Sequence, residues 1–168
     1  MKSNIILIGM SGAGKSTLSV LLAKALGMSF TDTDLLIQQK SGKLLQHIIE
    51  KEGIPRFLQL EEEVLCSLSV THTVIATGGS AVYSLRGMQH LKESGRVIYL
   101  SLPYEEVEKR LSNITTRGIV FLHHSTLQEV YEERLPLYEH YADLTFCCKG
   151  QDVEDSVSGL IARLDSVQ

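Results

Sequence analysis

Tryptophan is absent from this sequence of 168 residues, and proline and cysteine occur only three times each. The cysteines Cys66, Cys147 and Cys148 are odd in number and form no C-x-x-C motif, which argues against a disulfide framework and favours reduced thiols. No internal repeat or low-complexity segment divides the chain. The length therefore predicts one domain with a substantial core.

Clustered positive charge and long apolar runs are also missing. The net charge is −4, and affinity for the phosphate backbone of nucleic acids needs clustered lysine and arginine, so we expect no nucleic-acid partner. No apolar run approaches the roughly 18 residues of a membrane span. The first residues, MKSNIILIG, lead directly into a glycine-rich motif without the features of a secretory leader. We expect a monomeric cytoplasmic protein that binds no membrane.

Short β-branched runs alternate with segments of helical spacing along the chain. Strands are predicted at residues 4–8, 28–31, 73–76, 96–100 and 144–147. Helices are predicted over 15–26, in pieces between about 33 and 70 with breaks at 41–42 and 53–55, and over 103–111 and 152–164. The alternation predicts an α/β fold, in which helices cover both faces of a parallel sheet. Ligands of such folds bind beyond the carboxyl ends of the strands.

The stretch GMSGAGKST at residues 9–17 follows the first predicted strand and opens the first predicted helix. It matches the pattern G-x-x-x-x-G-K-[ST], whose backbone N–H groups surround a polyphosphate at a helix N-terminus. In this pattern Lys15 reaches the β- and γ-phosphates, and the Ser16 hydroxyl is available to Mg²⁺. The motif predicts binding of a nucleoside triphosphate.

The second predicted strand ends in the sequence Thr31-Asp32-Thr33-Asp34. Phosphoryl transfer in proteins with this glycine-rich loop uses a carboxylate near Mg²⁺. Asp32 and Asp34 lie two residues apart in a segment that we expect to be extended, and we expect one carboxylate to face the metal and the other to face the acceptor. The alternative is that Asp34 caps the helix that follows.

With these motifs in place, the sequence resembles the shikimate kinase family of P-loop kinases. The resemblance covers nearly the whole chain. It depends on GMSGAGKST, TDTD, EGIPRF before LEEEVL, VIATGGSAV, an arginine at Arg117 and ERLPLYEHYAD, in that order. It implies a three-layer P-loop fold with strand order 2-3-1-4-5, and a single kinase domain over residues 1–168 with a mobile lid at about 112–125.

The resemblance also implies a chemistry, which is transfer of phosphate from ATP, with Mg²⁺, to a hydroxyl of a small metabolite, foremost shikimate. The catalytic residues would be Lys15, Asp34 and Arg117. Ser16 and Asp32 would hold the metal, Asp32 through water. The nucleotide-binding residues would be Gly12, Ala13, Gly14, Lys15, Ser16, Thr17, Arg110 against adenine and Arg117 from the lid.

On the acceptor side, the resemblance assigns roles to Asp34, Gly78, Gly79 and Arg134. Asp34 would orient or deprotonate the acceptor hydroxyl. Gly78 and Gly79 would form a wall through their backbone groups, and Arg134 would bind the carboxylate of the acceptor. These roles suit a reaction that needs positioning and charge neutralisation more than covalent chemistry.

The sequence departs from the family pattern in the acceptor region. Leu58 stands where the family usually carries an arginine that binds the shikimate carboxylate, and Ser80 replaces the third glycine of a triplet. Arg56 lies about 200° away around a helix, so it is not expected to substitute for the missing arginine. Two alternatives therefore stay open, a different small hydroxylated acceptor and a nucleotide-binding regulatory module without turnover.

The run Glu61-Glu62-Glu63 lies in a predicted helix. A run of like charges usually marks the solvated face of a helix, and this is the interpretation we favour. Glu61 could instead neighbour the acceptor pocket.

Overall fold

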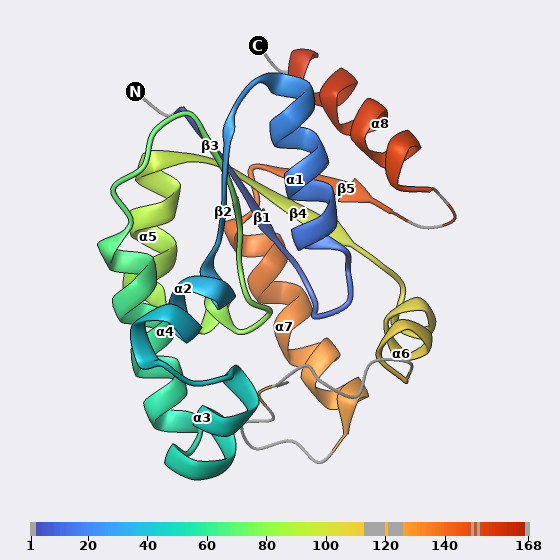
Figure 1. Ribbon diagram of the computed structural model, residues 1–168. Helices are drawn as coiled ribbons and strands as arrows, with labels where there is room; N and C mark the ends of the chain where they lie inside the picture. Colours follow the sequence, from blue (N-terminus) through green and yellow to red (C-terminus); the bar gives the residue numbers. More distant parts are fainter. Residues whose placement is uncertain (1–2, 113–119, 121–125, 149, 151, 167–168) are drawn as a thin grey trace.

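The computed structural model describes residues 3–112, 120, 126–148, 150 and 152–166. The chain alternates strands and helices, as expected (Figure 1). The strands are β1 (Asn4–Ile8), β2 (Ser29–Asp32), β3 (Thr73–Ala76), β4 (Gly95–Ser101) and β5 (Leu144–Cys147). The helices are α1 (Lys15–Leu26), α2 (Thr33–Ser41), α3 (Leu45–Glu52), α4 (Ile54–Ser67), the 3₁₀ turn η1 (Ala81–Tyr83), α5 (Leu85–Ser94), α6 (Tyr104–Ser112), α7 (Leu127–Tyr141) and α8 (Val153–Asp165).

The five strands form one parallel sheet in the order β2-β3-β1-β4-β5, which confirms the expected order. Helices α1 and α8 lie on one face and α7 lies behind the sheet (Figure 1). Strand β1 is buried along its whole length, as a strand covered on both faces must be. The carboxyl ends of β1, β2 and β3 thus meet at one edge, and the loops that follow them lie together.

The hydrophobic residues form two separate buried clusters. The larger one contains the sheet and the helices packed on it. The smaller one joins α2, α3 and α4, and its members are Ile37, Ile48, Phe57, Leu60, Val64 and Val120. Helices α2 to α4 therefore form a subassembly with a core of its own beside the carboxyl ends of β2 and β3.

Helix α7 is longer than local rules allow, because it contains Pro136 in its interior. A proline removes one helical hydrogen bond and usually breaks the helix. Here a capping box between Thr126 and Glu129 fixes the start of α7. Further along, Tyr138 stacks on Tyr99 of β4, with ring centroids 5.1 Å apart. Tertiary packing therefore holds the helix together across the proline.

The TDTD segment differs from our expectation of an extended chain. Strand β2 ends at Asp32, α2 starts at Thr33, and Asp34 lies in the first turn of the helix. The N-cap is Asp32, whose Oδ1 accepts hydrogen bonds from the backbone N–H groups of Asp34 at 2.9 Å and Leu35 at 3.4 Å. The alternative that Asp34 is the cap is thus wrong, since the turn begins two residues earlier.

Candidate active site

The glycine-rich loop joins β1 to α1 and has the geometry of a phosphate-binding loop. Gly14 immediately precedes α1 with φ of 88°, a left-handed conformation that favours glycine. The amino group of Lys15 is buried and donates to the carbonyl oxygens of Gly9 at 2.6 Å and Met10 at 2.8 Å. The Lys15 side chain therefore folds back over the loop, where its amino group can contact the phosphates of a nucleotide.

Ser16 and Asp32 come from different elements and lie side by side. The Ser16 hydroxyl donates to Oδ2 of Asp32 at 2.6 Å, while Oδ1 of Asp32 caps α2. A hydroxyl and a carboxylate oxygen are hard ligands of the kind that Mg²⁺ takes together with substrate phosphates and water. The pair fits the magnesium role that the sequence predicted.

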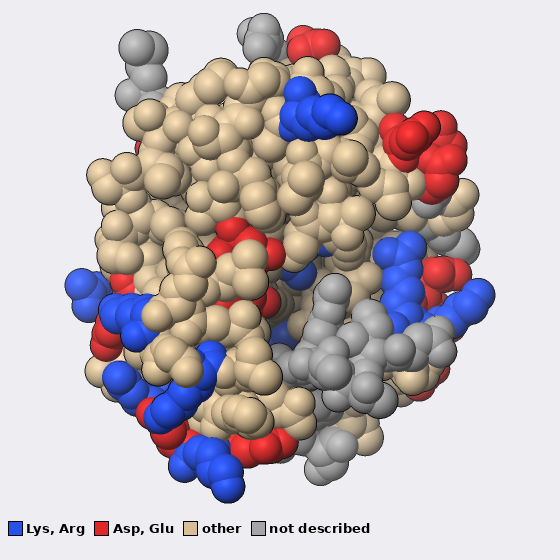
Figure 2. Space-filling model, in the orientation of Figure 1, with Lys and Arg blue, Asp and Glu red and all other residues tan. Residues whose placement is uncertain are grey.

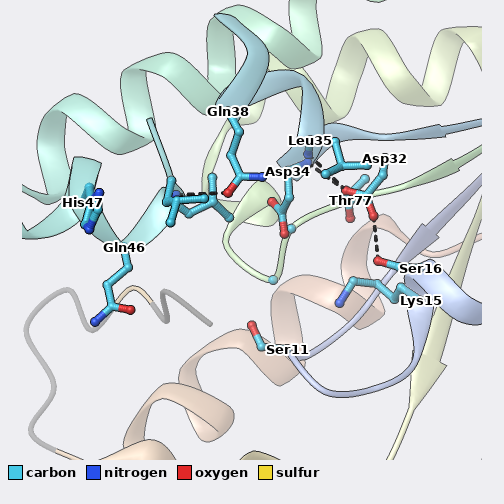
Figure 3. A pocket seen from close by; sticks show the side chains of 14 residues that line it. Ser11, Lys15, Ser16, Asp32, Asp34, Leu35, Gln38, Gln46, His47 and Thr77 are labelled. Atoms are coloured by element: carbon cyan, nitrogen blue, oxygen red, sulfur yellow. Dashed lines mark hydrogen bonds between the residues drawn. The ribbon is translucent and has the colours of Figure 1, made fainter. Parts of the chain in front are cut away.

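A cavity of about 350 Å³ opens beside the lysine, and the side chains that line it converge from several segments (Figure 3). Lys15 and Ser16 lie on its nucleotide side. Asp34 faces it from α2, while Gly78 and Gly79 close it behind β3. In the space-filling view, acidic and basic atoms meet in a hollow near the middle of this face (Figure 2). Asp34 thus lines the same cavity as the lysine of the phosphate loop.

The wall at Gly78 has no room for a side chain. A Cβ at Gly78 would lie 2.7 Å from Oδ1 of Asp34 and 2.7 Å from Oε1 of Glu61. At the next residue, Gly79, a Cβ would meet Nη1 of Arg134 at 2.9 Å. The two glycines therefore let two carboxyl groups and one guanidinium approach the same stretch of backbone.

Arg134 is one of the largest fully buried side chains, with 1% of its surface exposed. Its Nη2 donates to the carbonyl of Val120 at 2.7 Å and its Nε to the hydroxyl of Tyr83 at 3.2 Å, with the guanidinium over the Tyr83 ring. Tyr138, one turn along α7, donates to the carbonyl of Gly79 at 2.7 Å. These contacts fix Arg134 with Nη1 toward Gly79.

Arg110 lies on the other side of the phosphate loop, at the end of α6. Its Nη1 donates to the carbonyl of Gly12 at 3.4 Å. It lines a smaller pocket of about 130 Å³ together with Ala13, Gly14 and Thr17. The structure therefore gathers these nucleotide-side residues around a space next to the helix N-terminus. Arg117, and nearly all of the lid expected at about 112–125, lie outside the described residues.

Glu61 is the site feature that sequence reasoning placed wrongly. We favoured a solvated face for the acidic run, but Glu61 is 1% exposed, whereas Glu62 and Glu63 are half-buried and paired. Helical spacing could have predicted the burial of Glu61, because Phe57, Leu60 and Val64 place position 61 next to the buried stripe of α4.

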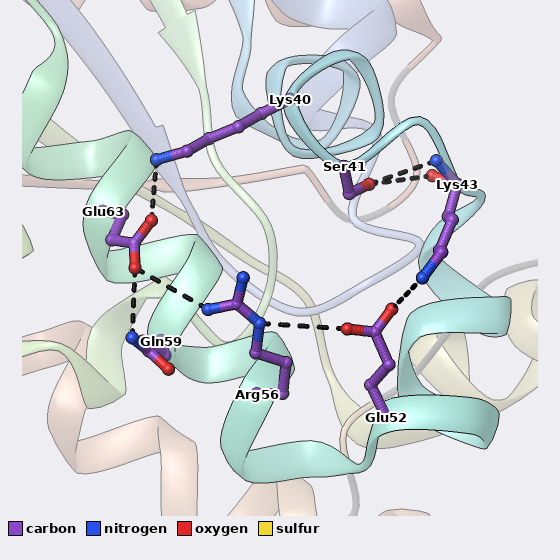
Figure 4. A network of polar contacts seen from close by, with 7 residues as sticks. All are labelled: Lys40, Ser41, Lys43, Glu52, Arg56, Gln59 and Glu63. Carbon is purple, nitrogen blue, oxygen red and sulfur yellow. Dashed lines mark hydrogen bonds and ion pairs between the residues drawn. The ribbon is translucent and has the colours of Figure 1, made fainter.

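Leu58 is half-buried and packs against the smaller hydrophobic cluster. Arg56, two residues earlier, lies on the outer side of α4, within 3.8 Å of both Glu52 and Glu63. Figure 4 shows it in a surface network with Lys40 and Lys43 that joins α2, α3 and α4. Arg56 therefore does not supply the acceptor pocket with the arginine that position 58 lacks, as expected.

The close approach of the Asp34 and Glu61 carboxyl groups to Gly78 leads to a testable prediction. We expect Gly78→Ala to lower kcat/KM for the acceptor by about tenfold or more, because the new methyl group displaces the Asp34 carboxyl from the cavity. Nucleotide affinity should hold, since Lys15 and Ser16 lie on the opposite side. Steady-state kinetics and calorimetric titration with ADP would measure both. A variant with wild-type kcat/KM would show that the wall tolerates a side chain.

Comparisons with known proteins agree with this geometry. A family model described as shikimate kinase matches residues 11–165. A shikimate kinase of Thiobacillus denitrificans is 36% identical over 167 residues, covering 98% of this chain and 91% of that protein.

Solved structures of shikimate kinases are similar to this chain over nearly its whole length. The shikimate kinase from Acinetobacter baumannii in complex with shikimate has a TM-score of 0.91 and 32% identity, with 99% of this chain and 94% of that chain covered. The shikimate kinase from Aquifex aeolicus has a TM-score of 0.83 and 29% identity, with 96% of each chain covered. The similarity extends over the nucleotide side and the acceptor side alike.

Proposed function

The chain belongs to the shikimate kinase family, and on that basis we propose that it transfers the γ-phosphate of ATP to a hydroxyl of shikimate, giving shikimate 3-phosphate. The observation that carries the proposal is the cavity that Lys15 and Asp34 share, closed on the acceptor side by Gly78 and Gly79. Phosphoryl transfer depends on positioning and on charge neutralisation, and this cavity supplies groups for both.

Each side chain has a distinct part in this proposal. Lys15 neutralises charge on the β- and γ-phosphates, which it meets once it leaves the loop carbonyls. Asp34 orients the attacking hydroxyl and takes its proton. Arg134 presents Nη1 to the carboxylate of shikimate. Arg117, from the family resemblance, covers the transferring phosphate when the lid closes over the site.

We assign Mg²⁺ to Ser16 and Asp32, which present a hydroxyl and a carboxylate to the same point. When bound, the ion would supply Lewis-acid charge to the phosphate oxygens. No group of three or more histidine, cysteine, aspartate or glutamate side chains able to hold a metal occurs among the described residues. Mg²⁺ commonly takes one or two protein oxygens together with substrate phosphates and water, which is the part proposed for Ser16 and Asp32.

Residues 1–168 act as one kinase domain in this proposal, and the acceptor is a small molecule. No described helix is long and apolar enough to span a membrane.

An ADP-release assay with MgATP tests the function directly. We expect ADP to form only when shikimate is added, together with one phosphorylated product that mass spectrometry identifies. Reactions without an acceptor and reactions with Lys15→Ala are the controls. Shikimate-independent hydrolysis, or turnover of another hydroxylated metabolite but not of shikimate, would overturn the assignment of the acceptor.

A further inference from the structure

Glu61 is a buried carboxyl group that the proposed mechanism does not use. It lies on α4 with 1% of its surface exposed. Its Oε2 accepts a hydrogen bond of 2.7 Å from the hydroxyl of Ser80, the residue that follows the glycine wall. Its Oε1 is buried without a hydrogen-bond partner in the described structure. A buried carboxylate with an unsatisfied oxygen is costly, so the group needs a functional or electrostatic explanation.

Charged groups face Glu61 from three other elements. Asp34 on α2 approaches it across Gly78, where both carboxyl groups lie 2.7 Å from the position of an alanine Cβ. Arg134 on α7 and Lys15 at the start of α1 act on it with the opposite sign, and the Tyr138 hydroxyl on α7 is close enough to interact with it. Glu61 thus approaches the expected base across Gly78 and lies within electrostatic reach of Arg134, whose Nη1 faces the next residue, Gly79.

No cation on its own helix compensates Glu61. Leu58 is three residues earlier on α4 and lines, with Glu61 and Tyr83, a pocket of about 260 Å³. Glu62 pairs outward with Ser84 and Arg86, and Arg56 is engaged in the surface network of Figure 4. The cation that can compensate an ionised Glu61 is therefore Arg134, which in the proposed function also binds the acceptor carboxylate.

Burial raises the pKa of Glu61 to about 8, and the negative charge of Asp34 adds to the increase, while Ser80, Arg134 and Lys15 oppose it. The carboxyl group is therefore neutral at pH 7 and gains its charge as the pH rises through about 8. In the neutral form it adds no negative charge beside Asp34. In the ionised form it attracts Arg134 and repels any anion that binds there.

We propose that Glu61 is a positioning residue whose protonation state sets the affinity for a carboxylate-bearing acceptor, because the neutral form leaves Arg134 to the acceptor and the ionised form competes for it. The inference rests on the proposed function, since it takes shikimate as the anionic acceptor. It makes Glu61 a specificity-determining group behind the Gly78 wall of the acceptor cavity, and it couples acceptor binding to the uptake of a proton.

The first test is the pH dependence of KM for shikimate in the wild type and in Glu61→Gln. The acceptor carboxylate is ionised throughout this range, so its own titration does not interfere. Between about pH 7 and 9.5 the wild-type KM should rise on the order of tenfold, because the competent protonation state becomes rare. Glutamine keeps an acceptor for Ser80 but cannot ionise, so its KM should change less than about twofold.

The second test measures the proton itself. Calorimetric titration of shikimate into the protein with MgADP, in two buffers of different ionisation enthalpy near pH 8.5, gives the number of protons taken up on binding. We expect net uptake approaching one proton for the wild type and none for Glu61→Gln. A purely structural role for Glu61 would produce no difference in proton uptake.

A third variant places a cation beside Glu61 without altering it. An arginine at position 58 lies one helical turn before Glu61, within reach of its carboxyl group. Leu58→Arg should lower KM for shikimate at pH 7 by about tenfold, as one added charge-assisted contact to the acceptor carboxylate would. It should also remove the rise of KM at alkaline pH, because the new guanidinium compensates the ionised Glu61. Leu58→Met, which keeps volume without charge, is the matched control and should follow the wild-type profile.

The outcomes separate this inference from the proposed function. A wild type that does not phosphorylate shikimate at pH 7 overturns the function and the inference with it. A wild type that phosphorylates shikimate, with KM and proton uptake that match those of Glu61→Gln across the pH range, leaves the function standing and overturns the inference alone. An unchanged KM in Leu58→Arg together with a persistent alkaline rise would contradict the inference as well.

Discussion

Lys15→Ala is expected to lower kcat on the order of 10³-fold, since the cation that neutralises the developing charge on the transferring phosphate is lost. ATP binding should weaken too, because the ammonium group contacts the phosphates in the ground state as well. In the described structure Lys15 is buried, and its amino group donates to two carbonyl oxygens of its own loop. Coupled kinetics with saturating shikimate and calorimetry with ATP would measure the two effects.

Lys24→Ala is the matched control for this variant. Lys24 is exposed in the last turn of the same helix and lies away from the phosphate loop. Its removal changes the net charge of the protein by the same amount, yet kcat should stay at the wild-type level. A Lys15→Ala protein that turns over within about threefold of wild type would remove Lys15 from the catalytic residues.

Asp34→Asn is expected to reduce kcat by roughly 10²- to 10⁴-fold, the range that general acid–base groups contribute. Asparagine has the same shape but cannot accept the proton of the acceptor hydroxyl. The fold should be preserved, because the cap of α2 is the Asp32 carboxylate, which accepts a hydrogen bond from the backbone N–H of residue 34 and not from its side chain. KM for ATP should change little, since the carboxyl group faces the acceptor cavity.

The same exchange at Asp165 provides the comparison. Asp165 is the last residue of α8 and is exposed. Asp165→Asn should leave kcat unchanged, and both variants should melt at the wild-type temperature. If Asp34→Asn keeps kcat within a few-fold of wild type, the proton leaves by another route and Asp34 only lines the cavity.

The nucleotide half of the site could be predicted from sequence because its determinants are local. Strand β1, the glycine-rich loop and α1 follow one another in 23 residues, and the structure has them at the predicted bounds. Strand order came from the family resemblance and is confirmed. Boundaries shifted by one residue at β2, where the chain turns directly into α2 at Asp32.

The acceptor half could not be derived from local sequence patterns, because distant segments assemble it. The family resemblance assigned Gly78, Gly79 and Arg134 to it, whereas the burial of Glu61 was missed. Glu61, Ser80 and Arg134 come from three separate parts of the chain, and only the fold brings them to Gly78 and Gly79. The burial of Glu61 overrides the usual fate of an acidic run, since its neighbours on α4 face the small cluster. Helix α7 likewise crosses Pro136 because of contacts far away in sequence, such as the stacking of Tyr138 on Tyr99.

The separate core beneath α2, α3 and α4 has a consequence for how this enzyme can diversify. Substitutions there, including those at Leu58, are expected to disturb the packing around β1 and the phosphate loop little, because the two clusters share no buried residue. Specificity for the acceptor can thus change during evolution while specificity for the phosphate donor is kept, as when one fold supports different functions through changes in its sites. A related chain can therefore come to phosphorylate another small metabolite while its phosphate-binding loop stays unchanged.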